Sequence, residues 1–377
     1  MTGTTSKALH ATSPGGVPTL LRSLLPFVLV ATLAILLQLV LRPILNDFYA
    51  KLLLDIGTNI VLAVSLTMVN GFTGQFSMGH AAFMMVGGYV AGSIVYYGGF
   101  RIFGNADVAG GTISTMLSGR EVSLVTGGDV LFLGALIAGG LAAALCGYLV
   151  GLPSLRLKGD YLAIVTLGFG EIVRVLIQSQ TKDVLYEPDA IAALPVYKWP
   201  LHSGGSLGFS GLPFYSSLFW AWLFAGLTLV IAYRLKSSSM GRAFLSIRED
   251  EVAAGAMGID TTKYKIRAFV LSAALAGIAG GIFAHTVGVQ LNPGELGFQK
   301  SFDIIIMVVL GGLGSISGAS IAAVILTILP ELLRDVAEYR MVVYALLLIL
   351  IMILRPQGLL GLREVWDVWR SRGKGTA

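Results

Sequence analysis

The sequence predicts an all-α integral membrane protein, a polytopic bundle of about ten transmembrane helices with one cytoplasmic helix inserted between two of them. Of its 377 residues, 55% are hydrophobic and 12% are charged, and the mean hydropathy is +0.80. Apolar runs of about 20 residues, the length that spans a bilayer, recur along the chain. Its 48 glycines allow helices to approach closely within a membrane. These properties favour one membrane bundle over two soluble domains.

Apolar segments mark the expected helices in order. The first, 23–41, lacks a small-residue cleavage site and is longer than the apolar core of a typical signal peptide, so we expect a retained helix. Segments 302–313 and 341–354 are short for a bilayer about 30 Å thick, and each either extends at its ends or is partly re-entrant. The expected spans are 23–41, 51–70, 80–98, 130–151, 161–178, 215–233, 268–288, 302–313, 317–333 and 341–354.

The distribution of basic residues predicts the orientation. With the N-terminus inside, the cytoplasmic segments hold 16 Lys and Arg residues, whereas the longer external segments hold nine. The positive-inside rule therefore places both termini in the cytoplasm. Because this topology accounts for the net charge of +5, we expect a lipid bilayer and no nucleic acid as the partner. The expected organisation is a disordered cytoplasmic tail at 1–22, a transmembrane domain at 23–354 and a cytoplasmic tail at 355–377.

Two stretches raise the question of an internal repeat. The second to fifth spans and the seventh to tenth are candidates for inverted copies of one four-helix unit, a common arrangement in transporters. "FMMVGGYVAGS", 83–93, resembles "IIMVVLGGLGS", 305–315, with one residue inserted before the paired glycines. Chance matching of glycine-rich sequence explains the similarity equally well, so both interpretations stay open.

A charged amphipathic helix is predicted at 240–257. Ser239 is a good N-cap, and Gly258 is placed to end the helix. The helix cannot span the bilayer, because each central charge costs about 2.5 to 3.5 kcal/mol on insertion scales. Apolar residues recur at steps of three or four, and charged residues occupy other directions. The apolar set is Met240, Phe244, Ile247, Ala254 and Met257, and the charged set is Arg242, Arg248, Glu249, Asp250 and Glu251.

This helix has two interpretations. A helix lying on the membrane surface usually carries a polar face rich in Lys and Arg, whereas here three acids stand against two arginines. The acidic face favours a protein partner that receives the apolar stripe in a groove.

"REDEVAAGAMGID", 248–260, resembles the coupling segment through which permeases of ABC importers dock on their ATPase. The acid, the alanine pair and the following glycine of that segment match Glu251, Ala253, Ala254 and Gly258. With the adjoining charges, the resemblance implies ATPase coupling by Arg248, Glu249, Glu251, Ala253, Ala254 and Gly258.

A wider resemblance runs in order from about residue 50 to 361. "GQFSMGHAAFMMVGGY" (74–89), "LPSLRLKGDYLAIVTLGFGEIVRVL" (152–176), "LNPGELGFQKSFDIIIMVVLGGLGSISGA" (291–319) and "LRPQGLLG" (354–361) resemble the LivM-type permeases of bacterial branched-chain amino acid importers. The resemblance implies transport of leucine, isoleucine or valine across the inner membrane. It also implies three kinds of partner: ABC ATPase subunits, a second permease of the LivH type and a periplasmic binding protein.

The sequence holds no GxxxxGK(S/T) phosphate loop, no HExxH and no cysteine–histidine cluster, and Cys146 is its single cysteine. We therefore expect a transport subunit that is not an enzyme and holds no metal or cofactor, with ATP bound by its partners. Two alternatives stay open: an ABC permease for urea or short amides, and a secondary transporter needing no ATPase, with Asp55 or Glu171 as its coupling group.

Two groups of polar residues are candidates for the translocation pathway. Gln75, Ser77 and His80 flank glycines at the start of the third span, and the competing interpretation is a histidine hydrogen-bonded to a neighbouring loop. Glu171 and Arg174 lie three residues apart on the fifth span, close enough to pair. They line a polar path or gate, or they form a structural ion pair that locks helices together.

Overall fold

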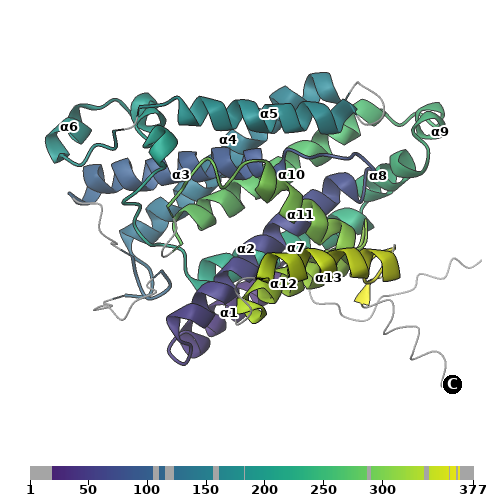
Figure 1. The fold of residues 1–377 in the computed structure, drawn as a ribbon, viewed down its shortest axis with the longest axis horizontal. Helices are drawn as coiled ribbons and strands as arrows, with labels where there is room; N and C mark the ends of the chain where they lie inside the picture. The colour runs from purple at the N-terminus through teal and green to yellow at the C-terminus, as the bar shows by residue number, and fades with distance from the viewer. Residues whose placement is uncertain are drawn as a thin grey trace, which may run out of the picture.

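The computed structural model describes residues 19–104, 110–114, 123–155, 161–181, 183–286, 290–334, 339–355, 357–361 and 364–365, and the predicted tail at 1–22 lies almost entirely outside them. The described chain is helical (Figure 1), apart from loops and one isolated bridge between Phe209 and Leu291. The long helices are α1 (Thr19–Leu36), α2 (Asp47–Asn70), α3 (His80–Phe103), α4 (Gly127–Ser154), α5 (Tyr161–Gln178), α7 (Leu218–Ser237), α10 (Thr261–Ala284), α11 (Phe298–Gly311), α12 (Ile316–Leu332) and α13 (Arg340–Leu354).

A helix occupies each of the ten segments that the sequence marked. Within the described residues, seven of them, α1 with its π-helical extension Leu37–Leu41, α2 to α5, α7 and α10, are long and apolar enough to cross a membrane. The shorter helices are α11 with 14 residues, α12 with 17 and α13 with 15. The fold is thus a polytopic helical membrane protein, and a total of ten spans stays a prediction.

The core lies where α10 packs between α3, α4 and α2. Glycines make this packing close: a Cβ atom on Gly280 would collide with the main-chain carbonyl of Met84, and one on Gly87 with that of Gly277. This is the small-residue contact expected between helices in a membrane. In contrast, α1 and α5 lie at the periphery on opposite sides of the bundle (Figure 1), and most residues of each helix are not buried.

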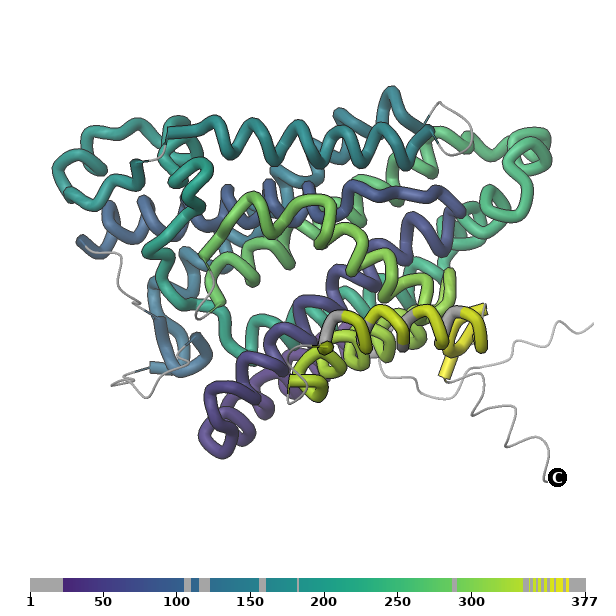
Figure 2. Tube along the Cα trace, in the orientation of Figure 1, coloured from purple at the N-terminus to yellow at the C-terminus, as the bar shows by residue number. Residues whose placement is uncertain are grey.

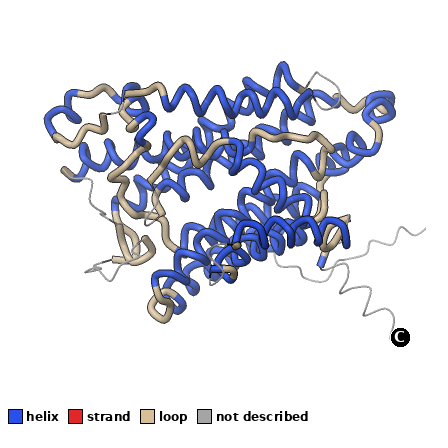
Figure 3. The backbone as a smooth tube through the Cα atoms, viewed as in Figure 1, coloured by secondary structure: helices blue, strands red, loops and turns tan. Residues whose placement is uncertain are grey.

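Two helices begin inside the bundle after non-helical segments. Residues 71–79 precede α3 and residues 290–297 precede α11, and Figure 3 shows both as loops running beside helices. The two helix starts are in contact, because the backbone N–H of Ala81 donates to Ser301 Oγ at 3.2 Å. Met78 N–H donates to Thr166 Oγ1 on α5 at 3.0 Å. Irregular backbone at such depth is tolerated where protein surrounds it or where it lines a cavity.

The short helices sort to opposite ends of the bundle. Figure 2 shows α8 (Ser239–Glu249) and α9 (Glu251–Ala256) at one end, with α6 (Pro188–Ala193) at the other. The turn between α1 and α2 lies away from α8 and α9, so each of these two long helices connects the two ends.

Candidate functional site

The predicted single helix at 240–257 is wrong in its continuity, because the chain forms two helices that meet at Asp250. The backbone of Asp250 is extended (φ −156°, ψ 111°) and ends α8. Its carboxylate then accepts the N–H groups of Val252 at 2.8 Å and Ala253 at 3.0 Å, which caps α9. A side chain that caps the following turn requires this non-helical backbone, so Asp250 sets the break.

The two ends of the α8–α9 pair are capped nearly as predicted. The N-cap is Ser238 and not the predicted Ser239, since Gly241 N–H donates to Ser238 Oγ at 3.1 Å. Beyond α9, Gly258 has φ +86°, as predicted for the glycine that ends the helix. Ile259 N–H then donates to the Ala254 carbonyl at 3.1 Å, which closes the last turn.

The apolar stripe of α8–α9 faces the rest of the chain. Phe244, Ile247 and Ala254 are buried, and Phe244 packs edge-on against Tyr264 at the start of α10. The expected insertion of this stripe into a partner's groove is therefore wrong for these residues, because the protein's own helices already cover them. Met257 departs from the stripe and is 84% exposed.

Polar contacts also anchor this pair to the bundle. Arg248 Nη1 donates to the carbonyl of Gly71, just beyond the end of α2, at 3.0 Å, and Arg248 also pairs with Glu249 at 2.7 Å. Glu251 forms an ion pair of 2.6 Å with Lys265 on α10. The Lys265 side chain is 2% exposed. The pair is therefore held against α2 and α10 by directed bonds as well as by apolar contact.

The outward face of α9 is small and apolar. Val252 is 74% exposed and Met257 84%, so two apolar side chains at this end of the bundle are not covered by the chain itself. The six predicted coupling residues divide accordingly. Arg248, Glu251 and Ala254 point inward, whereas Glu249, Ala253 and Gly258 are exposed. We call the exposed apolar and small residues of this segment the α9 surface: Val252, Ala253, Gly255, Ala256, Met257 and Gly258.

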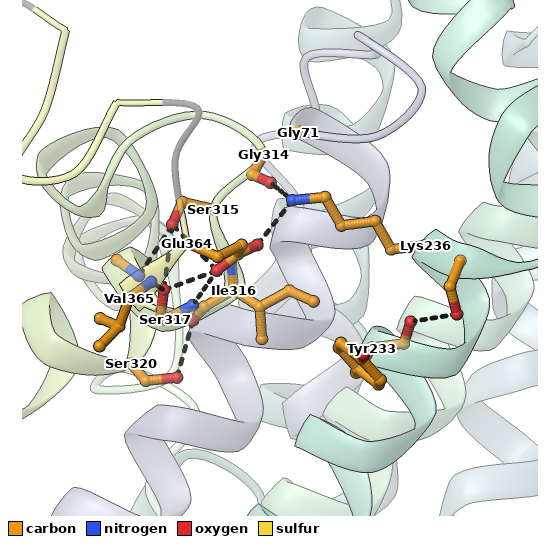
Figure 4. A network of polar contacts seen from close by, with 12 residues as sticks. Gly71, Tyr233, Lys236, Gly314, Ser315, Ile316, Ser317, Ser320, Glu364 and Val365 are labelled. Carbon is orange, nitrogen blue, oxygen red and sulfur yellow. Dashed lines mark hydrogen bonds and ion pairs between the residues drawn. The ribbon is translucent and has the colours of Figure 1, made fainter. Parts of the chain in front are cut away.

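A polar network joins the end of α7 to the start of α12 (Figure 4). Lys236, near the end of α7, donates to the Gly314 carbonyl at 2.8 Å and pairs with Glu364 at 2.6 Å. Glu364 also accepts the N–H groups of Ile316 and Ser317, each at 3.0 Å. A carboxylate bound to free N–H groups in the first turn of a helix is electrostatically favourable. Glu364 thereby connects the chain beyond α13 to the end of α7, just before α8, and to the start of α12.

The bonds to Glu364 outweigh the cost of burying it. Burial of this carboxyl would by itself raise its pKa, but Lys236, the Ser317 hydroxyl and the two N–H groups hold the pKa below its ordinary value. Glu364 is therefore ionised at neutral pH, and its negative charge belongs to the folded structure.

The three candidate pathway residues before and at the start of α3 differ in their burial and in their hydrogen-bond partners. His80 is 2% exposed, and its Nε2 lies 2.9 Å from Ser65 Oγ on α2, so its partner is a helix and not the neighbouring loop considered from the sequence. Ser77 is buried, with its N–H bonded to Asn70 Oδ1 at 3.2 Å. Gln75 is half-buried; its side-chain amide donates to the Thr73 carbonyl at 3.5 Å, and its backbone N–H donates to the Val69 carbonyl at 3.3 Å.

Glu171 and Arg174 pair as their spacing predicted, at 2.7 Å. Both belong to α5, and Arg174 also donates to Gln178 of the same helix at 3.1 Å, so these bonds stay within one helix. The α5 helix nevertheless meets the start of α11: Glu171 lines a small hollow with Gly297 and Ser301. The structure thus brings Glu171 close to the place where the starts of α3 and α11 touch.

Comparison with known proteins shows which family the chain belongs to. A family model described as the permease component of the branched-chain amino acid transport system matches residues 48–352. The chain belongs to this permease family. The LivM permease of Escherichia coli K12 is 35% identical over 317 residues, covering 80% of this chain and 67% of that relative. LivM of Methanocaldococcus jannaschii is 27% identical, covering 83% and 93%, and LivH of Salmonella typhimurium is 29% identical, covering 82% and 94%. No solved structure is significantly similar.

Membership of this permease family makes the chain a multi-pass membrane transport protein for branched-chain amino acids, with the role of a transport subunit. The match begins at the start of α2 and ends within α13, so it includes α8, α9 and the helix starts of α3 and α11. It stops before Glu364, which the sequence reading also missed. Nothing in the sequence near Glu364 indicates its partners, since Lys236 and Ser317 lie 128 and 47 residues away.

Proposed function

We propose that the chain is the permease subunit of an ABC importer that carries leucine, isoleucine and valine across the bacterial inner membrane, using ATP hydrolysed by separate subunits. The permease family and the names of its relatives support this substrate class. The α8–α9 end is the cytoplasmic end in this proposal, in agreement with its basic residues.

The observation that carries the proposal is the α9 surface. The apolar stripe and most of the polar anchors are used within the chain. The residues left to meet a partner are Glu249, Val252, Met257 and the small residues between Val252 and Met257. Small residues allow close approach, and two exposed apolar side chains supply the knobs for a complementary pocket. An ATPase docked here would act on a helix pair fixed to α2 and α10.

The contacts of α8 give a route for movement into the bundle. Arg248 bonds to Gly71 beyond α2, and Lys236, three residues before α8, bonds to Gly314 between α11 and α12. Gly71 and Gly314 are themselves packed together, since a Cβ on Gly71 would lie 2.6 Å from the Gly314 nitrogen. A shift of α8 therefore moves the joined ends of α2 and the α11–α12 turn. Coupling requires that the ATPase bind one position of this unit more tightly than another.

The packing pattern supports an inverted repeat in which α2 to α4 correspond to α10 to α12. Helix α4 packs on α10 and α3, and α12 packs on α2 and α11. Likewise α3 packs on α10, and α11 on α2. Exchanging each helix for its counterpart turns one set of contacts into the other, and both α3 and α11 follow a non-helical segment. In transporters of this design the substrate path lies where the repeats meet.

The partners in this proposal are two ABC ATPase subunits, a second permease of the LivH type and a periplasmic substrate-binding protein. Relatives named LivM and LivH both match the chain, which supports a pair of related permeases. The chain itself is not an enzyme in this scheme and holds no cofactor.

The test is co-purification of the tagged chain from detergent extract, comparing the wild type with the double variant Val252→Glu/Met257→Glu. Charge at the centre of a docking contact opposes burial, so the variant is expected to lose the ATPase while keeping the second permease. The control is Leu207→Glu, an exposed apolar side chain (64% exposed) at the α6 end of the bundle. An ATPase retained by the double variant contradicts docking on α9.

Reconstituted uptake tests the substrate. Labelled leucine is expected to enter proteoliposomes only when binding protein and ATP are present, and unlabelled isoleucine or valine is expected to compete. Competition by urea or acetamide instead would overturn the substrate assignment, and uptake without any ATPase would favour a secondary transporter.

A further inference from the structure

A cavity of about 780 Å³ opens between α2, α11 and α12, beside α13. We call it the outer cavity, because the start of α2 and the end of α12 bound it, and Figure 2 shows both away from α8 and α9. Its size is within the range of roughly 300 to 1,000 Å³ that is usual for small-molecule sites. In the proposed orientation, it lies in the half of the bundle that faces the periplasm.

Charged groups of both signs line this cavity. Lys300 and Asp303 come from the first turns of α11, and Asp55 comes from α2, eight residues after the helix begins at Asp47. Lys51 and Glu331 lie nearer the helix ends. Ionisable side chains within a membrane are costly and usually serve a ligand, an ion path or each other.

These charges do not serve each other by direct contact. Among the described residues, no ion pair within 4 Å joins Lys51 or Lys300 to Asp55, Asp303 or Glu331. Lys300, Asp303 and Asp55 nevertheless line the same cavity. The cavity thus holds opposite charges near one another with space between them, which is the arrangement that receives a molecule carrying both charges.

Lys300 is also held in place by hydrogen bonds that run through two uncharged side chains. Its Nζ lies 3.4 Å from Asn59 Oδ1 on α2, and Asn59 Nδ2 donates to Thr327 Oγ1 on α12 at 2.9 Å. The bond to Thr327 fixes which end of the Asn59 amide meets the ammonium, because the amide nitrogen is already used as a donor. A neutral amide oxygen orients Lys300 without neutralising it, so the positive charge remains available for an anion.

The rest of the wall is apolar. Ile306 and Met307 on α11 and Leu326 on α12 line the same cavity. An amino acid with an aliphatic side chain presents a carboxylate, an ammonium and an apolar group in a molecule small enough for this volume. A site for such a ligand combines predominantly apolar walls with a few placed polar groups.

We propose that the outer cavity is a binding site for zwitterionic aliphatic amino acids on their path through this chain. Lys300 binds the carboxylate, Asp55 on the facing helix binds the ammonium, and the wall of Ile306, Met307 and Leu326 receives the side chain. This inference rests on the proposed import function and specifies where in the permease the substrate is held.

The test uses the complete importer in proteoliposomes, with labelled leucine, saturating binding protein and ATP, and compares Lys300→Gln and Asp55→Asn with the wild type. Each variant is expected to lower the rate of leucine uptake at least tenfold, while assembly and the ATP hydrolysis stimulated by liganded binding protein stay within about twofold. The matched control is Lys198→Gln, which removes an exposed charge elsewhere at the α6 end and is expected to leave uptake unchanged.

The outcomes separate this inference from the import function on which it rests. If the wild-type complex takes up no leucine, the import function itself fails. If the wild type transports leucine and both cavity variants transport it as well as Lys198→Gln does, the outer cavity is not the site. If one variant does not assemble, the other decides, because Lys300 and Asp55 lie on different helices and are proposed to bind opposite ends of the same molecule.

Discussion

Charges are used in two different ways around α8 and α9 and in the outer cavity. Around α8 and α9, basic and acidic groups meet directly: Glu251 pairs with Lys265, and Lys236 pairs with Glu364, each at 2.6 Å. In the outer cavity, Lys300 and Asp55 face the same space without forming a direct pair. Both sets lie on or beside membrane helices, where an unpaired charge is expensive.

This difference between paired and separated charges corresponds to the two tasks of an importer subunit, which are coupling to the ATPase and binding of the substrate. Paired charges fix one packing and so carry movement between elements, as a rigid link must. Charges that are kept apart leave their binding capacity for a ligand. We infer that the pairs near α8 and α9 belong to coupling, and that the outer cavity belongs to the substrate.

The largest effect is expected from breaking the pair beside α8. Glu364→Ala removes the partner of Lys236 and two bonds to the first turn of α12, and leaves a partly buried cation uncompensated. Loss of one member of a buried pair costs about 3 to 5 kcal/mol, and the 24% exposure of the Lys236 side chain favours the lower value.

The measurement for this variant is thermal unfolding in detergent, followed by intrinsic fluorescence. Glu364→Gln is the control, because its single amide oxygen can still accept one of the two N–H bonds that the Glu364 oxygens receive from Ile316 and Ser317, so a smaller loss is expected. Equal unfolding midpoints for Glu364→Ala and the wild type would show that the network does not stabilise the fold.

A second experiment compares one lysine from each end. Lys265→Met removes a paired cation and leaves Glu251 without its partner, and because Glu251 is 38% exposed we expect a loss of about 1 kcal/mol. Lys300→Met removes a cation that has no direct ionic partner, so stability is expected to stay the same or rise.

Thermal midpoints of the two methionine variants, measured in one detergent, provide the comparison. A larger loss of stability in Lys300→Met than in Lys265→Met would mean that the outer charges hold the fold together and are not kept for a ligand.

The pH dependence of stability follows from Glu364. Its pKa is lowered in the folded protein, so the stabilisation is complete above the unfolded pKa of about 4.3 and is lost as the pH falls through the lower folded pKa. Between pH 6 and about 3.5, the wild type is therefore expected to lose more stability than Glu364→Gln, which has no carboxyl to protonate. Parallel curves for the two proteins would exclude this contribution.

Much of the helical arrangement could be predicted from the sequence, because hydrophobic length is a local property. The segment predicted at 161–178 begins and ends at the observed residues of α5. The segment predicted at 80–98 begins at the observed first residue of α3. The charged helix was also predicted, yet its break was not. Asp250 was assigned to a continuous polar face, although an Asp that caps the next turn requires a non-helical backbone.

The parts of the site that were missed depend on distant contacts. Which side of α8 faces inward is decided by Tyr264 and by Gly71, the latter 177 residues from its partner Arg248. Asp55 was considered only as the coupling group of a secondary transporter, and its position in a cavity with Lys300 depends on the packing of α2 against α11. Periodicity within one helix carries no information about such pairings.

A smaller effect is expected at the junction of α8 and α9. Asp250→Ala removes the side chain that caps α9, which costs about 1 kcal/mol. The expected result is faster amide hydrogen exchange at 252–256 with little change in the global midpoint, whereas Asp250→Asn keeps most of the protection. Exchange that is unaltered in Asp250→Ala would show that the break does not depend on the cap.

The most direct measurement of the contrast between the two ends is uptake of leucine and hydrolysis of ATP recorded in the same proteoliposomes. Lys300→Gln is predicted to retain ATP hydrolysis stimulated by the binding protein and to lose uptake, because its coupling end is intact. Val252→Glu/Met257→Glu is predicted to lose both activities, because the ATPase no longer docks. If the two variants lose the same activities, or if Lys300→Gln transports leucine at the wild-type rate, the division between a coupling end and a substrate end is contradicted.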